Sequence, residues 1–261
     1  MALRALFGRK AAAAAPLPAP HALDLASASG GTVSRALSRE ALADRYLRGA
    51  GIEIGALHNP LKVPDAAKVT YVDRMPNEAL RAHYKKLGDT PLVAIDRYDD
   101  GEKLSTFADG SQAFVIANHF LEHCESPLHA LQAMHRVLQP GGILYLAVPD
   151  KRFTFDQVRP VTPFAHVWRD YQEGPAWSRS AHFEEWARHC WQVDRQKSEV
   201  EILAQARHFE AINYSVHFHV WSPTEILEIL AAFPHIGLAG LNLVLFHSSD
   251  HEMRMILQRA D

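Results

Sequence analysis

The feature that most constrains the fold is an apolar strand, an amphipathic helix and a second apolar strand between residues 113 and 148. Residues 113–117 (AFVIA) contain no polar side chain, which is typical of a parallel strand buried on both faces. Residues 127–138 (PLHALQAMHRVL) have helical apolar spacing, and the following Pro-Gly-Gly ends that helix before the apolar residues 143–148. This unit predicts two parallel strands joined by a right-handed crossover.

The same alternation extends in both directions along the chain. Further strands are expected at residues 52–54, 68–73, 91–95, 240–246 and 253–258, and further helices at residues 34–47, 77–87 and 222–232. Strands that alternate with helices in this way predict an α/β fold. We expect a doubly wound, Rossmann-like, mainly parallel sheet of seven strands.

The chain divides into regions of different composition. Residues 1–32 are rich in Ala and Pro, and we predict a disordered tail there. Residues 33–261 are predicted to form one domain. Within it, residues 151–215 are rich in Arg, His and aromatic side chains and show no strand pattern. We expect this segment to be a helical cap, inserted after the fifth strand, that binds the substrate.

Charge and hydropathy exclude several classes of protein. The 27 basic and 30 acidic residues nearly balance, and no segment concentrates Lys and Arg among aromatics, so we expect no nucleic-acid partner. No apolar run approaches the roughly 20 residues that span a bilayer, so we expect no membrane span. The oligomeric state is left open.

The cysteines and histidines also limit the possibilities. Cys124 and Cys190 are too few for a disulfide framework, and reduced thiols fit a cytoplasmic protein. The 16 histidines are scattered along the chain without a His-Glu-x-x-His spacing. We therefore expect no metal site.

Two acidic residues end neighbouring predicted strands. Glu53 and Asp73 are separated by 73 − 53 = 20 residues. In doubly wound sheets an acidic residue about 20 positions after the first turn accepts hydrogen bonds from ribose hydroxyls. The alternative is that Asp73 only caps its strand.

Two more polar segments follow the third and fourth predicted strands. A carboxylate in the loop Asp99-Asp100-Gly101-Glu102 could accept the exocyclic amine of adenine, although a solvated acidic turn has the same composition. Residues 118–123 (NHFLEH) place Asn, Glu and two His directly after the buried strand. Ligands bind such sheets at this edge, which favours a binding function.

The order EIG, YVD, DDGEKL, FVIANHFLEH and HRVLQPGGILYLAVP resembles that of the class I S-adenosylmethionine-dependent methyltransferases. The resemblance covers roughly Gly51 to Pro149. It implies S-adenosyl-L-methionine as cofactor, with its methionine part against Glu53, Gly55 and Ala56, its ribose on Asp73, its adenine amine on Asp100, and its methyl side against Asn118 and His119. The adjoining Arg74, Gly101 and Glu122 complete the expected cofactor site.

The sequence departs from the family pattern after the first strand. The usual Gly-x-Gly-x-Gly loop is reduced to a single glycine, Gly55, and Pro60 and Pro64 occupy the expected crossover helix. Because proline disfavours helix interiors, this helix is expected to be short or lost. Ala113 also replaces an acidic residue often found there. A non-catalytic protein of the same fold remains an alternative. A nicotinamide-dependent oxidoreductase is less favoured, because it needs a fuller glycine turn at a helix start.

Methyl transfer from a sulfonium needs mainly positioning, and a hydroxyl acceptor also needs a general base. The candidates for this catalytic base are His119, His123, His217 and His219. The Arg, Lys and Trp side chains of the cap could recognise a polar or anionic acceptor. The sequence therefore predicts methyl transfer to an oxygen of a small molecule such as a sugar or glycan.

Overall fold

The computed structural model describes residues 36–191, 197–249 and 251–261. The predicted tail at residues 1–32 lies outside these residues. Strands of the described chain form one sheet in the order β3-β2-β1-β4-β5-β7-β6. Their bounds are β1 Gly49–Ile54, β2 Ala67–Asp73, β3 Arg97–Tyr98, β4 Gln112–Asn118, β5 Leu138–Pro149, β6 Leu241–Ser249 and β7 Glu252–Arg259.

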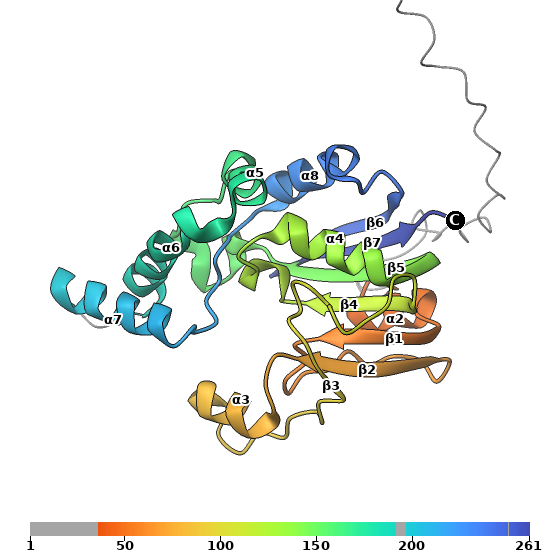
Figure 1. The fold of residues 1–261 in the computed structure, drawn as a ribbon, viewed down its shortest axis with the longest axis horizontal. Coiled ribbons are helices and arrows are strands. Elements are labelled where there is room, and N and C mark those ends of the chain that lie inside the picture. The colour runs from red at the N-terminus through yellow and green to blue at the C-terminus, as the bar shows by residue number, and fades with distance from the viewer. Residues whose placement is uncertain (1–35, 192–196, 250) are drawn as a thin grey trace, which may run out of the picture.

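The first five strands run parallel, and β7 pairs antiparallel with both β5 and β6. The predicted seven-stranded, mainly parallel sheet is therefore confirmed. The reversal at β7 puts the late hairpin beside β5, and the loops that follow β1 to β5 all reach the same edge (Figure 1).

Helices flank the sheet. Their bounds are α2 Arg39–Tyr46, α3 Asn77–His83, α4 Pro127–Val137, α5 Phe164–Glu173, α6 Arg179–Trp186, α7 Glu199–Ala211 and α8 Pro223–Ala231, with a π-helical turn at Ala187–Trp191. Single 3₁₀ turns lie at Lys85–Leu87, Leu121–His123, Lys151–Phe153, Phe155–Val158, Pro175–Trp177 and Phe233–Ile236. At α8, Ser222 and Glu225 form a capping box, as the Ser-Pro start predicts.

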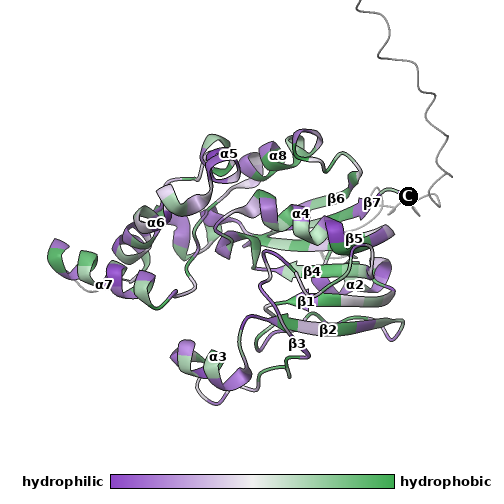
Figure 2. Ribbon diagram, in the orientation of Figure 1, coloured by the Kyte–Doolittle hydropathy of each residue, from purple (hydrophilic) through white to green (hydrophobic). Residues whose placement is uncertain are grey.

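The strand β4 is apolar throughout residues 113–117 because helices cover both faces of the sheet at this strand. Phe114 and Ile116 pack with α2, whereas Val115 and Ala117 pack with α4 and α8. Since side chains alternate along a strand, the unbroken AFVIA sequence supplies both halves of the core. Figure 2 shows apolar residues along these central strands.

Residues 91–95 differ from the sequence-based prediction, and residues 55–66 agree with it. The third strand is Arg97–Tyr98, so its prediction at residues 91–95 is wrong. Those residues instead bond to neighbouring loops: Val93 N–H donates to Leu57 O, and Val93 O accepts from Asn77 Nδ2. No helix forms in residues 55–66 between β1 and β2, as the two prolines predict.

The segment after β5 is helical, and α5, α6 and α7 extend beyond the edge at which the parallel strands end (Figure 1). The chain then returns to the sheet through the extended residues 214–221. We call residues 151–215 the cap; its role in binding substrate stays a prediction. Among the described residues, no helix is both long and apolar enough to cross a membrane.

Candidate active site

Glu53 holds the loop that replaces the missing helix. Its side chain is only 1% exposed, and its two carboxylate oxygens accept from Leu61 N–H at 2.9 and 3.2 Å. Burial raises the pKa of Glu53 to about 7, although the Leu61 hydrogen bond opposes that shift. The carboxylate therefore shapes residues 55–61 from within.

Asp73 lies nearer the open edge. Glu53 is in register with Tyr71, so Asp73 is two residues further along the same face of the sheet. Its carboxylate accepts from Arg74 N–H at 2.7 Å, and burial raises its pKa. The Arg74 guanidinium turns to the cap, where it donates to Asn213 O at 3.2 Å.

The loop after β3 packs tightly against the end of β1. A Cβ atom on Gly101 would lie 2.6 Å from both Ile54 and Phe120, so only glycine fits there. Gly55 adopts a φ of +66°, which lets the chain turn sharply after β1. Gly55 and Gly101 are therefore both set close to Phe120.

The two aspartates of this loop have separate tasks. Asp99 accepts from Asp100 N–H and from the N–H and hydroxyl of Thr106, which together hold its pKa low although burial opposes this. Asp100 is half exposed and pairs with Lys103 at 2.6 Å. Of the two, Asp100 is the carboxylate accessible to a ligand.

Unpartnered polar atoms gather after β4. Both amide atoms of Asn118 and both carboxylate oxygens of Glu122 are buried without a hydrogen-bond partner. Glu122 is 1% exposed, and this burial raises its pKa. Such groups are costly to bury unless a ligand or water satisfies them. This set therefore fits a polar ligand.

A cation cluster around Glu252 supports the same loop. Glu252, at the start of β7, binds Arg39 of α2, Arg254, and His119 at 3.1 Å. Burial raises the pKa of Glu252, but these three partners outweigh it and hold that pKa well below its usual value. His119, in the left-handed conformation at φ +50°, is thus fixed between Glu252 and Glu122.

Sequence reasoning missed Arg39 and Glu252, because they are 213 residues apart and belong to no local motif.

The structure separates the four histidine candidates. Burial lowers the pKa of His123 to about 3, and its Nδ1 bonds to Val216 O at 2.9 Å. His219 is fully buried, and its pKa is lowered by that burial. His119 is paired with Glu252.

His217 forms a His–carboxylate dyad with Asp156 beside the sheet edge. Its Nδ1 lies 2.6 Å from Asp156 Oδ2, and its side chain remains 12% exposed. Burial would raise the pKa of Asp156, but His217 and Arg159 hold it below its usual value. A narrow recess beside this dyad, with no room for a water-sized molecule, is lined by Glu122, Pro149, Lys151, Asp156, His217, His219, Val220 and Trp221.

A larger groove of about 670 Å³ lies between α3 and the cap. Its lining begins at Met75, two residues after Asp73, and continues with Ala79, Ala82, His83, Lys85, Trp186, Trp191, Gln205, His208, Phe209, Ile212 and Tyr214. The lining is mainly aromatic and apolar.

Residues 49–146 match the family model described as a methyltransferase domain. Over residues 49–146, this match and the sheet order are those of a class I S-adenosylmethionine-dependent methyltransferase domain. The cofactor of that class is S-adenosyl-L-methionine.

Curated relatives of the chain are thiol S-methyltransferases. The human protein named thiol S-methyltransferase TMT1B is 28% identical over 116 residues, 44% of each chain. Its mouse counterpart is 33% identical over 84 residues, 31% of this chain and 34% of that protein. The chain thus spans less than half the length of these relatives.

Among solved structures, the chain is similar to a SAM-dependent methyltransferase from Aquifex aeolicus. The TM-score is 0.44 at 12% identity, over 82% of this chain and 85% of that one.

Proposed function

We propose that this protein transfers the methyl group of S-adenosylmethionine to a hydroxyl oxygen of a small polar acceptor, such as a sugar or glycan, with His217 as general base. The observation that carries the proposal is the His217–Asp156 dyad beside the ends of β4 and β5. Of the other candidates, His119 has a carboxylate at each ring nitrogen, Glu122 and Glu252, and burial lowers the pKa of His123 and of His219.

The cofactor supplies an electrophilic methyl group on a sulfonium. Asp73 is proposed to hold its ribose and Asp100 its adenine amine, because both carboxylates lie at strand ends and are partly exposed. Asn118 offers unpartnered polar atoms on the methyl side of the cofactor, and Glu122 offers two more in the same loop. Gly55, Ala56 and Gly101 would bring the backbone close to the cofactor. Glu53 and Arg74 would act indirectly, because they bond to Leu61 and Asn213 in the adjoining segments.

The dyad fixes how His217 can act. Asp156 stays ionised and accepts the Nδ1 proton, which leaves Nε2 as a proton acceptor. A hydroxyl placed within hydrogen-bond reach of Nε2 would lose its proton as the oxygen attacks the methyl carbon. Asp156 acts through His217, so it is a positioning residue.

The cap residues expected to recognise the acceptor divide into two groups. Arg159 is buried and paired with Asp156 and Glu185, so it supports the dyad and is not free for an acceptor. Lys151 lines the recess, and its Nζ donates to Gln157 O at 3.0 Å. Trp177 is 42% exposed beneath Arg169, a surface on which a sugar ring could stack.

A thiol is the second candidate acceptor, because the curated relatives are named thiol S-methyltransferases. A thiol loses its proton near neutral pH and depends less on a base than a hydroxyl does. The dyad therefore favours the hydroxyl.

Calorimetric titration with S-adenosylhomocysteine and, separately, NADH tests the cofactor. Binding of the first at micromolar concentration, without the second, is expected; binding of NADH alone would overturn the assignment. Methyl transfer to panels of sugars and of small thiols then tests the acceptor. Cofactor binding with no transfer to either panel would favour the non-catalytic alternative.

A further inference from the structure

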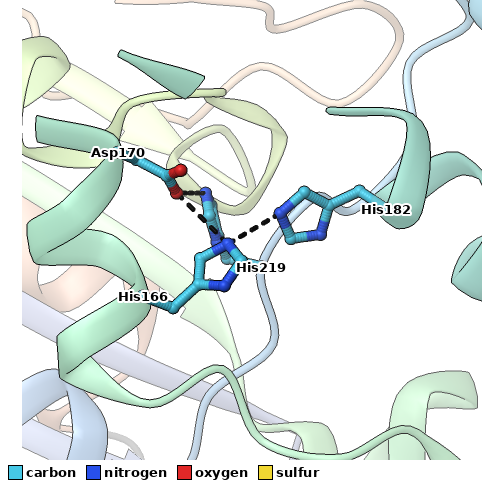
Figure 3. A group of neighbouring side chains, drawn as sticks. All are labelled: His166, Asp170, His182 and His219. Carbon is cyan, nitrogen blue, oxygen red and sulfur yellow. Dashed lines mark hydrogen bonds and ion pairs between the residues drawn. The ribbon is translucent and has the colours of Figure 1, made fainter. Parts of the chain in front are cut away.

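A cluster of three histidines and one aspartate lies where the cap meets the segment that returns to the sheet, next to the recess. His166 and Asp170 come from successive turns of α5, His182 from α6, and His219 from the extended return to the sheet (Figure 3). Each residue directs one possible ligand atom to a common point, and these four atoms lie within 4.8 Å of one another.

Hydrogen bonding within the cluster leaves several buried atoms unpartnered. His166 Nε2 and His182 Nε2 are 2.9 Å apart, so one proton can be shared between them. Both ring nitrogens of His219 and Asp170 Oδ2 are buried and have no hydrogen-bond partner. His219 and Asp170 are each 0% exposed. A purely structural hydrogen-bond network would not strand these atoms.

The spacing fits a four-coordinate ion. Zinc bonds to His nitrogen and carboxylate oxygen measure about 2.0–2.2 Å, so tetrahedral ligands lie about 3.3–3.6 Å apart. His166 Nε2 is 3.3 Å from Asp170 Oδ2, and His219 Nε2 is 3.8 Å from that same oxygen. These two separations, and the 2.9 Å between His166 Nε2 and His182 Nε2, lie within about half an ångström of such an edge. All four ligand atoms lie within 4.8 Å of one another.

We propose that His166, Asp170, His182 and His219 bind one divalent transition-metal ion, of which Zn²⁺ fits the donors best. Imidazole and carboxylate ligands suit this class of ion. Four protein ligands leave no open position, which is typical of a structural zinc site and not of a catalytic one. This proposal differs from the sequence-based expectation of no metal site.

Neighbouring side chains orient two of the four proposed ligands. Ser178 Oγ donates to Asp170 Oδ1 at 2.9 Å, which orients the carboxylate so that Oδ2 faces the cluster. Trp221 stacks on His219 at 5.4 Å and fixes its ring plane. An ion here would join α5, α6 and the return segment, and so would hold His217, two residues from His219, in place.

The test measures metal directly and does not depend on methyl transfer. The full chain, purified without a metal-affinity tag, is analysed for bound metals by mass spectrometry. It is then stripped with a chelator and titrated with Zn²⁺ by calorimetry and with Co²⁺ by visible absorption. One equivalent of metal per chain is expected, together with the intense visible bands of tetrahedral Co²⁺.

Variants locate the ion. Asp170→Asn and His182→Ala should each weaken Zn²⁺ binding by about 100-fold or more, and Ser178→Ala, which keeps all four ligands, by about 10- to 100-fold. His235→Ala, an exposed histidine outside the cluster, should bind like the original protein. Circular dichroism checks that each variant is folded, and Ser178→Ala stands in if a ligand variant is not.

The proposal is overturned if the stripped protein binds neither ion. It is equally overturned if folded Asp170→Asn and Ser178→Ala bind Zn²⁺ as tightly as His235→Ala does.

Discussion

The two halves of the sheet edge are built in different ways. In the cofactor half, formed by the loops after β1, β2 and β3, carboxylates bond to backbone N–H groups a few residues away, as Glu53 does with Leu61 and Asp73 with Arg74. In the acceptor half, which is proposed to bind the acceptor and is formed by the loop after β5 with the cap, side chains pair over long separations. His217 and Asp156 are 61 residues apart.

The difference separates two tasks. Local bonds in the cofactor half set loop shapes, so changes there should alter cofactor affinity. Distant pairs in the acceptor half set protonation states and positions, so changes there should alter turnover. The next four predictions test whether this division holds.

The largest effect is expected from His217→Ala. Loss of a general base typically costs about 100- to 10,000-fold in rate, and we expect kcat with a hydroxyl acceptor to fall by that amount. Affinity for S-adenosylhomocysteine should stay within about twofold. With a thiol acceptor the loss should be much smaller. The exposed His235→Ala is the control; an unchanged kcat for His217→Ala would break the comparison at its acceptor side.

Glu252→Gln should destabilise the fold at the junction of the two halves. Removing one partner of a buried ionic cluster costs about 3–5 kcal/mol. Because the folded-state pKa of Glu252 is depressed, its stabilisation is present above about pH 4.5 and is lost as the pH falls further.

Urea unfolding at pH 7 and pH 4 measures this effect, with the exposed Glu228→Gln as control. The difference in free energy of unfolding between Glu252→Gln and the original protein should be smaller at the lower pH. A difference that grows on acidification would contradict a depressed pKa for Glu252.

Asp73→Ala should weaken S-adenosylhomocysteine binding without a matching loss of stability. A charge-assisted hydrogen bond contributes about 1.5–3 kcal/mol, which corresponds to roughly 10- to 100-fold in Kd. Calorimetry measures it, and Asp65→Ala, an exposed aspartate between β1 and β2, is the control. Equal affinity in both variants would remove Asp73 from the cofactor site.

Glu53→Gln gives the smallest and most local change. Since the folded-state pKa of Glu53 is about 7, the folded protein holds a proton that the unfolded chain loses near pH 4.5. Stability of the original protein therefore falls as the pH rises from about 5 to 8, by about 2 kcal/mol from this group.

The Gln variant keeps the acceptor for Leu61 but cannot ionise, so it should lack this component of the decline. Thermal unfolding at pH 5 and pH 8 measures the difference, with the exposed Glu78→Gln as reference. Parallel declines in both variants would show that Glu53 is already ionised at pH 5.

Much of the cofactor half could be predicted because its signals are local. The apolar residues of β4 and β5 and the prolines after β1 determine those elements through short-range pattern and backbone chemistry. The third strand was misplaced because Val93 bonds to Leu57 and Asn77, two contacts that only the folded loops create.

The acceptor half could be predicted less well. The sequence shows His166 and Asp170 four residues apart, but it does not show that α6 and the return segment bring His182 and His219 to them. His217 was one of four equal candidates until the structure paired it with Asp156.

The Glu252 cluster links the last strand of the chain to the His119 loop and to α2. Glu252 opens β7, an inner strand, yet its carboxylate anchors the His119 loop on one side and the first described helix on the other. A shortened protein lacking its last ten residues would therefore lose more than a strand. It would lose the carboxylate that ties the His119 loop to α2.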